Sequence, residues 1–236
     1  MIITIHQPDF MPWFGLFRKI SGADTWVVLD HVTNNPRDAN FWGRRVRILI
    51  NGEPKWLSVP LRRPELPGVV GIPISAMKVN LDDPKVLERN WRTVQMAYAK
   101  APFFELHEDL VKRFLTSDDP SLMMRNLAFI ESVMQLLGIN TRMVLSSSLN
   151  VGTSGSEMLV DIIKLIGGST YLHGTGASGY QKDQMFYDSN IELQANTFEH
   201  PEYFHLRTEK FFAGLSIIDM LFNARLADIQ TWVTQQ

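Results

Sequence analysis

The first twenty residues, MIITIHQPDFMPWFGLFRKI, constrain the fold of this chain more than any other stretch. The run Ile2–Ile5 is mostly β-branched, which is typical of a buried strand. Pro8 ends that strand, because proline donates no backbone hydrogen bond and pushes the residue before it out of helical space. Pro12 stands where the first turn of a helix tolerates proline, and apolar residues follow at helical spacing. The stretch therefore predicts a strand, a polar turn and a helix.

A second strand is predicted over Asp24–Asp30, which completes a β-α-β unit. In a sheet built from such units, ligands bind at the carboxyl ends of the strands, beside the helix N-termini. His6, Gln7 and Asp30 all fall at such ends. Two interpretations of the first turn stay open: a ligand site that includes His6, or a histidine that only hydrogen-bonds a turn shaped by prolines.

Residues 44–61 have the pattern of a β-hairpin, with an Asn-Gly turn at 51–52. The predicted hairpin interrupts the β-α-β order and brings four basic residues into one neighbourhood: Arg44, Arg45, Arg47 and Lys55. Such a cluster suits a phosphate or carboxylate ligand. A solvated face of an edge hairpin is the more common reason for this pattern.

Three successive helical patterns over residues 83–138 predict a helical lobe. Each pattern begins at or beside a proline, and Gly138 closes the last one. His107 lies on the second helix among acidic neighbours, and we expect it at the surface.

Alternating strands and helices are predicted again beyond the helical lobe. The expected strands cover residues 143–147, 169–173 and 191–196. Ser154 and Glu157 have the spacing of a capping box at the start of the helix that follows the first of these strands. Residues 174–180, GTGASGY, form a glycine-rich loop whose backbone N–H groups can approach a phosphate. That loop lacks the lysine of a Walker motif and a clean G-x-G-x-x-G pattern.

The last segment predicts a helix over residues 211–223 with three polar side chains on one face. These are Ser216, Asp219 and Asn223. On one interpretation this face closes a ligand pocket. On the other, Ser216 is a helix N-cap and the other two are ordinary solvated residues, and spacing alone favours this second interpretation.

Together these patterns predict a single α/β domain over residues 1–236. We expect a Rossmann-like, three-layer, mostly parallel sheet with the hairpin as an insertion and a helical subdomain at about 83–138. The apolar fraction of 45% is enough for a sizeable core.

Composition and motifs exclude several classes of function. A net charge of -2 gives no basic footprint for nucleic acid. Without cysteine there are no disulfides, thiolate metal sites or cysteine nucleophile. His200 and His205 with two nearby glutamates follow no regular pattern, so we expect no metal site. Neither a signal peptide nor an apolar stretch near the roughly 18 residues of a membrane span is present, which predicts a cytoplasmic protein.

Five stretches in this order resemble the WbqC-like family: IHQPDFMPWFGLFRKI, GADTWVVLD, AYAKAPFF, TYLHGTGASGY and LSIIDMLFN. The resemblance runs over nearly the whole chain, and it implies a context in gene clusters for O-antigen and other surface polysaccharides. It points to these positions: His6, Gln7, Pro8, Trp13, Gly15, Lys19, Asp30, Tyr98, Tyr171, Gly174, Tyr180, Ser216, Asp219 and Asn223. At His173 the family commonly has a smaller polar residue such as serine.

The first functional hypothesis is a transferase that joins a small acyl or aminoacyl group to an amino sugar or sugar nucleotide in polysaccharide assembly. His6 is then the general base, and Asp30 or Asp219 orients it or the sugar hydroxyls. The expected substrate-binding residues are Gln7, Trp13, Gly15, Lys19, Arg45, Tyr98, Tyr171, His173, Gly174, Tyr180, Ser216 and Asn223. No cofactor is specified, and the expected partner is a small molecule rather than nucleic acid.

Two other hypotheses stay open. The first βα turn has a fainter similarity to nucleotidyltransferases with an HxGH motif, which suggests a nucleotidyltransferase or adenylate-forming enzyme. Residues 13–16 stand at that position here, and both histidines are missing. The third hypothesis is a non-catalytic ligand-binding or scaffold protein in which His6 and Asp30 are only structural.

Overall fold

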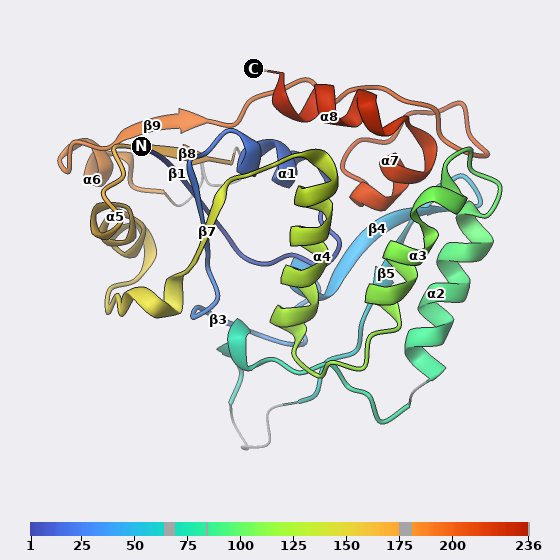
Figure 1. The fold of residues 1–236 in the computed structure, drawn as a ribbon. Helices are drawn as coiled ribbons and strands as arrows, with labels where there is room; N and C mark the ends of the chain where they lie inside the picture. Colours follow the sequence, from blue (N-terminus) through green and yellow to red (C-terminus); the bar gives the residue numbers. More distant parts are fainter. Residues whose placement is uncertain (64–68, 84, 175–180, 236) are drawn as a thin grey trace.

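The computed structural model describes residues 1–63, 69–83, 85–174 and 181–235 (Figure 1). A sheet of five parallel strands forms its centre, which confirms the predicted α/β fold. In spatial order the strands are β7 (Arg142–Leu145), β2 (Thr25–Val28), β1 (Ile2–His6), β8 (Thr170–His173) and β9 (Glu192–Ala195).

The first strand of the chain lies in the middle of this sheet. β2 and β7 extend the sheet on one side of β1, and β8 and β9 extend it on the other. Ile3 lies opposite both Thr25 of β2 and Tyr171 of β8. The direction in which strands are added therefore reverses between β1 and β8. In doubly wound sheets, ligands bind at the carboxyl ends of the strands beside this reversal.

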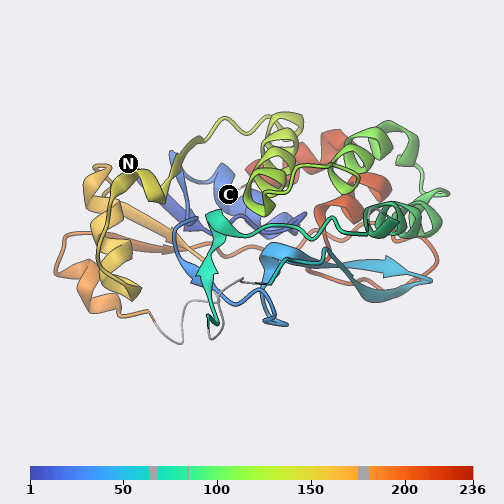
Figure 2. The same ribbon diagram turned by 90° about the horizontal axis from the view of Figure 1, so that it is seen from below.

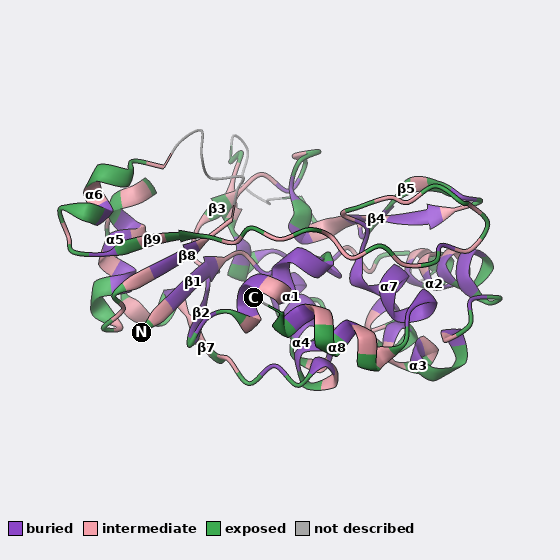
Figure 3. Ribbon diagram, turned by 90° about the horizontal axis from the view of Figure 1, so that it is seen from above, coloured by how far each residue is buried: buried purple, intermediate pink, exposed green. Residues whose placement is uncertain are grey.

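Helices cover both faces of the sheet, so the fold has three layers (Figures 1 and 3). One face carries α1 (Phe14–Ser21), α4 (Leu122–Leu137) and α8 (Leu226–Thr234), and the other carries α5 (Gly155–Leu165) and α6 (Asp183–Tyr187). Side chains alternate between the faces along each strand. Trp26 and Val28 therefore join the core under the first layer, while Ile5 and Val27 join the core under the second.

The predicted hairpin lies to one side of the sheet, next to the helical part (Figure 2). Its strands are β4 (Arg45–Ile50) and β5 (Glu53–Ser58). Asn51 and Gly52 have φ values of 54° and 78°, and a type I′ turn requires positive φ at both positions. Shorter elements complete this region: β3 (Thr33–Asn34), β6 (Ile72–Pro73), η1 (Trp42–Arg44), η2 (Ile74–Ala76) and, beside β7, η3 (Ser146–Leu149).

The register of the hairpin separates Lys55 from the strand arginines. Lys55 lies opposite Ile48, whereas Arg47 lies opposite Trp56. Side chains of opposed residues share a face, and successive residues alternate between faces. Lys55 is thus on the other face of the hairpin from Arg47, so the predicted four-residue basic neighbourhood is reduced to arginines.

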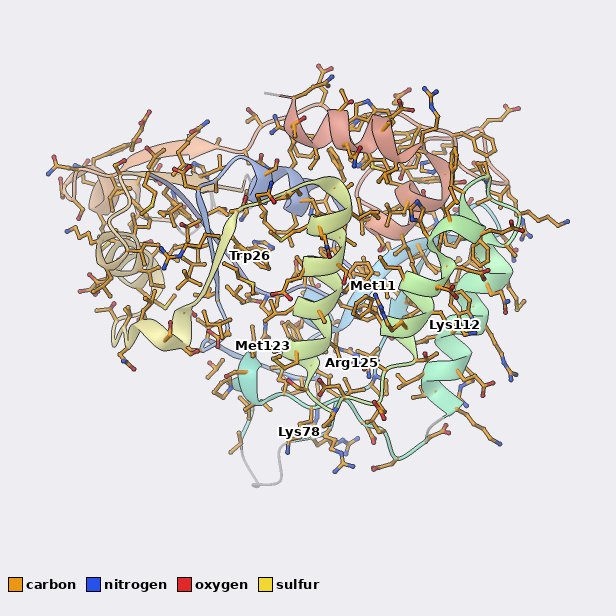
Figure 4. The ribbon with its side chains drawn as sticks, viewed as in Figure 1. Met11, Trp26, Lys78, Lys112, Met123 and Arg125 are labelled. Atoms are coloured by element: carbon orange, nitrogen blue, oxygen red, sulfur yellow. The ribbon has the colours of Figure 1, made fainter. Side chains whose placement is uncertain are left out.

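The three helices predicted for the helical lobe are α2 (Lys85–Tyr98), α3 (Phe104–Leu115) and α4. Arg125 of α4 is buried and donates hydrogen bonds to the carbonyls of Phe114, Leu115 and Ser117, which ties the end of α3 to α4 (Figure 4). Gly138 closes α4 with a φ of 73°, as predicted. Within the described ranges, no helix is both long and apolar enough to span a membrane.

Some local predictions were wrong. His107 is buried and not at the surface, because α3 packs against both α2 and α7. Ser154 caps α5 without a side-chain hydrogen bond, so its capping box does not form. The helix predicted over 211–223 is shorter: α7 spans Ile217–Asn223. The segment before it hydrogen-bonds to β4 instead, through the Ser216 N–H and the Arg47 carbonyl at 2.8 Å.

Candidate active site

Two cavities meet at His6, the last residue of the central strand. The α1-side cavity has a volume of about 320 Å³ and the α5-side cavity one of about 460 Å³. The α1-side cavity is lined by His6, Trp13, Gly15, Leu16, Lys19, Gly174, Asn196, Thr197, Phe198, His200 and Ala213. Residues lining the α5-side cavity include His6, Gln7, Asp9, Asn34, Asn40, Trp42, Ser156, Tyr171 and Gln181. His6 is therefore accessible from both sides, at the edge where the sheet predicts a ligand.

Both ring nitrogens of His6 have charged partners. Nε2 lies 3.1 Å from Oδ2 of Asp9, and Nδ1 lies 3.1 Å from Nζ of Lys19. An ionised carboxylate only accepts hydrogen bonds and an ammonium only donates them. The proton of the neutral ring is thus assigned to Nε2, and Nδ1 carries the lone pair. Lys19 also donates to the carbonyl of Ile5 at 3.2 Å, which fixes its position.

Burial shifts the pKa values of Lys19 and His6. Burial lowers the pKa of Lys19 to about 8, although the Asp9 carboxylate opposes the shift. Burial, and then the Lys19 ammonium, lower the pKa of His6 below its ordinary value, again against Asp9. At neutral pH the proton therefore resides on Lys19, and His6 is a neutral base between a cation and an anion. Such a set of shifted groups beside a cavity is typical of an active site.

The start of α1 and the strap, residues 196–216 between β9 and α7, form the wall of the α1-side cavity. The indole of Trp13 stacks on His200, with ring centroids 6.3 Å apart, and lies 5.8 Å from Phe198. A Cβ atom at Gly15 would lie 2.3 Å from the Trp13 ring, so only glycine allows the indole to fold back over the helix. Asn196 donates to the Gly15 carbonyl at 3.3 Å. This wall is apolar and aromatic, in contrast to the charged group at His6.

The α5-side cavity is more polar. Its walls include the side chains of Asn34, Asn40 and Gln181, and Ser156 lies in the first turn of α5. Within the described residues, Oε1 of Gln181 is buried without a hydrogen-bond partner. A polar ligand would find donors and acceptors around it here.

Asp30 is buried and lines neither cavity. Its Oδ1 accepts hydrogen bonds from the Ser146 hydroxyl and the Ser147 N–H, each at 2.9 Å. These bonds join the end of β2 to η3, which follows β7. Asp9, which the sequence analysis did not select, occupies the place beside His6 instead.

Asp219, which is itself fully buried, is at the centre of a second cluster. It accepts hydrogen bonds from the Tyr98 hydroxyl at 2.7 Å, the Tyr203 hydroxyl at 3.0 Å and Nδ1 of His205 at 2.9 Å. Burial, followed by the Asp219 charge, raises the pKa of both tyrosines well above the ordinary value. Nε2 of His205 accepts from the Phe212 N–H at 3.2 Å. These bonds join Tyr203 and His205 of the strap to Asp219 of α7, which also bonds Tyr98 of α2, so the cluster anchors the strap to both helices.

The two remaining polar residues of α7 also make internal bonds. The Ser216 hydroxyl donates to the Met11 carbonyl at 2.7 Å and accepts from the Ile218 N–H as the helix N-cap. Asn223 donates to the Asp219 carbonyl at 2.8 Å. Ser216 thereby holds the end of the strap against the turn between β1 and α1.

The structure brings together part of the predicted site. On the cavities lie His6, Gln7, Trp13, Gly15, Lys19, Tyr171 and Gly174. Buried away from them are Asp30, Tyr98, Ser216, Asp219 and Asn223. Arg45 is on the hairpin, His173 ends β8 with Nδ1 3.2 Å from the Gly174 carbonyl, and Tyr180 lies outside the described residues.

Asp9 and Asn196 were not selected from the sequence, and His200 was considered only as a possible metal ligand and not as part of this cavity. The signal for Asp9 was present, because an acidic residue three positions after His6 across a proline turn can fold back onto the ring. For Asn196 and His200 no local signal exists, since only the tertiary path of the strap brings them to the cavity. The described part of the chain contains no group of three or more histidine, aspartate or glutamate residues placed to hold a metal ion.

The structure is that of an α/β protein with a Rossmann-like parallel sheet and two cavities at the reversal of its strand order. The chain belongs to the WbqC-like protein family, whose model matches residues 7–231. It is 24% identical over 225 residues to the uncharacterized protein Rv1507c of Mycobacterium tuberculosis, covering 94% of this chain and 93% of that protein. A zinc-bound structure of an AdcAII variant from Streptococcus pneumoniae matches 98% of both chains with 12% identity and a TM-score of 0.21, too low to support an argument.

Proposed function

We propose that this protein is a transferase that joins a small acyl or aminoacyl group to the amino group of an amino sugar, carried as a sugar nucleotide, in the assembly of O-antigen or another surface polysaccharide. The observation that carries the proposal is the hydrogen-bonded chain Asp9–His6–Lys19 at the meeting point of two cavities. A reaction between two substrates needs two binding sites and a base between them. The polysaccharide context comes from the family resemblance alone.

His6 is the general base in this proposal, and Nδ1 is its basic nitrogen because Asp9 holds the Nε2 proton. The acceptor nitrogen forms a bond to the acyl carbon while one of its protons passes to Nδ1. The bond between the acyl carbon and the leaving group breaks, and the proton then passes from Nδ1 to the leaving group. His6 is thereby returned to its neutral form.

Lys19 supplies positive charge beside this base. Its ammonium lies on the α1-side cavity and is held independently by the Ile5 carbonyl. When the acceptor replaces Lys19 at Nδ1, the ammonium is free to stabilise the oxyanion that forms at the acyl group. This assigns the acyl donor to the α1-side cavity and the sugar nucleotide to the more polar α5-side cavity.

Thermal unfolding with sugar nucleotides, coenzyme A and ATP tests the binding part of the proposal. A ligand at a hundred times its Kd stabilises a protein by about 2.7 kcal/mol, which raises the Tm of a chain of this size by roughly 5–10 °C. We expect a sugar nucleotide and an acyl carrier each to raise the Tm. If none of the three ligand classes does so, the proposal is wrong.

Product analysis by mass spectrometry tests the chemistry. An acylated sugar nucleotide is expected with the wild type and with Asp82→Asn, which changes an exposed carboxylate far from His6 in sequence. His6→Ala is expected to fold normally and to lose the product. Pyrophosphate release from an NTP would indicate an adenylate-forming enzyme instead, and normal polysaccharide synthesis with His6→Ala would indicate a non-catalytic protein.

A further inference from the structure

Two tryptophans and two arginines form an exposed surface on the hairpin, which we call the hairpin platform: Trp42, Arg45, Arg47 and Trp56. Trp42 is 42% exposed and Trp56 is 45% exposed, with their rings edge to face and 5.3 Å apart. The guanidinium of Arg45 lies 3.4 Å from the centre of the Trp56 ring. Arg47 lies opposite Trp56 in the strand register, so its side chain shares this face. Large exposed aromatic side chains that gather in one place usually mark a binding surface.

The arginines of the platform have no anionic partner within the described ranges. Among the described residues, no carboxylate lies within 4.0 Å of Arg45, Arg47 or the neighbouring Arg44, although all three are half-buried. Within the part of the chain that the structure describes, the Nε atom of each is enclosed by protein without a hydrogen-bond partner. Partly burying two like charges, Arg45 and Arg47, on one face of the hairpin is unfavourable unless an anion compensates for them. This arrangement favours a ligand with negative charge.

The platform is continuous with the α5-side cavity and is fixed relative to His6. Trp42 lines that cavity together with His6 and Asp9. The buried amide of Asn126 donates to the carbonyl of Pro8 at 2.8 Å and to that of Gly43 at 2.7 Å. The Phe10 N–H also donates to the Trp42 carbonyl at 2.9 Å. A ligand that reaches from His6 to the hairpin would therefore meet a preformed surface.

We infer that the hairpin platform binds the nucleoside diphosphate part of the sugar nucleotide, an inference that rests on the proposed function. Arg45 and Arg47 bind the diphosphate through their guanidinium forks, and the exposed indole of Trp42 stacks on the base. The sugar then extends into the α5-side cavity toward His6. A simple carboxylate or phosphate ligand would use the arginines but would have no need of the paired tryptophans.

Isothermal titration of the full chain with UDP, GDP and ADP, and with pyrophosphate, tests this assignment. We expect at least one nucleotide to bind. Arg45→Gln and Arg47→Gln should each raise its Kd about tenfold, as expected for loss of a charge-assisted phosphate contact. Arg62→Gln, which removes an exposed arginine paired with Asp82, serves as the matched control and should leave the Kd unchanged. Trp42→Leu should weaken nucleotide binding about tenfold and leave pyrophosphate binding unchanged.

The titration contains no acyl donor, so it separates this inference from the proposed function. If a nucleotide binds in this manner but no transfer occurs, the proposed reaction is wrong and the platform stands. If no nucleotide binds at millimolar concentration, or if both arginine variants bind it as the wild type does, the assignment of the platform as a nucleotide site is wrong. A third outcome would also overturn the inference: nucleotide and pyrophosphate bind equally well, and Trp42→Leu changes neither affinity. The platform would then be a plain anion site.

Discussion

His6–Asp9 and His205–Asp219 are two histidine–aspartate pairs with almost the same geometry, 3.1 Å and 2.9 Å between nitrogen and oxygen. Their surroundings differ. The side chains of the first pair are 37% and 15% exposed and face two cavities, whereas those of the second are 2% and 0% exposed. The distance between the two side chains therefore does not distinguish the pairs, whereas their exposure to the cavities does.

The third partner of each histidine separates the pairs further. Nε2 of His205 accepts a backbone N–H from Phe212, a group that does not titrate. Nδ1 of His6 instead meets Lys19, whose lowered pKa of about 8 lets it exchange a proton near neutral pH. One pair holds the strap in place, and the other has the partners of a general base.

The same substitution in both pairs gives the largest expected difference. Asp219→Asn removes a buried charge and places an amide donor among three hydrogen-bond donors: Tyr98, Tyr203 and His205. We expect the free energy of unfolding to fall by about 3–5 kcal/mol, measured by urea denaturation. A loss below about 1 kcal/mol would mean that the cluster is not the anchor described above.

Asp9→Asn should affect stability little and activity strongly. The pair with His6 is partly exposed, so its loss should change the free energy of unfolding by no more than about 1 kcal/mol. The rate of acyl transfer should fall about 100-fold or more, because the ring loses the carboxylate that holds its Nε2 proton. Steady-state kinetics on the folded variant measures this effect. An unchanged rate would remove Asp9 from the mechanism.

The lowered pKa of Lys19 predicts that the free energy of unfolding depends on pH. Its pKa is about 8 in the folded chain against an ordinary value of 10.5, so the unfolded state binds more protons between these values. The free energy of unfolding should therefore rise as pH increases from 8 to 10.5, by at most about 3 kcal/mol from this group. Urea denaturation of the wild type and of Lys19→Met across this range measures the effect.

The difference in free energy of unfolding between the wild type and Lys19→Met isolates the contribution of Lys19. Tyr98 and Tyr203 have raised pKa values and contribute the opposite slope above pH 10, but they do so in both proteins. The free energy of unfolding of Lys19→Met, relative to that of the wild type, should therefore decrease as pH rises. Parallel curves for the two proteins would show that Lys19 is not destabilised in its protonated form.

The sequence predicted the parts of this protein that depend on neighbouring residues. The strand that ends before Pro8, the Asn51-Gly52 turn and the helix closed by Gly138 all follow from backbone preferences within a few positions. The burial of His107 was missed because it depends on helices far along the chain.

The candidate site shows the same difference between features set by neighbouring residues and features set by distant segments. His6 was selected from the first βα turn and Lys19 from the family resemblance, and both line a cavity. Asp219 was selected for its position on a polar helix face, yet its carboxylate accepts hydrogen bonds from the hydroxyls of Tyr98 and Tyr203. Whether a polar residue meets solvent or another side chain is decided by packing between distant segments, which spacing along one helix does not contain.

The central place of β1 has a consequence for synthesis. The ribosome makes β1 long before its neighbour β8, which begins only at Thr170. At about 5–20 residues per second, the nascent chain waits roughly 10–30 s before the second edge of β1 is paired. During this interval an unpaired hydrophobic edge is open to other chains. Newly made protein should therefore depend on chaperones far more than the finished molecule does.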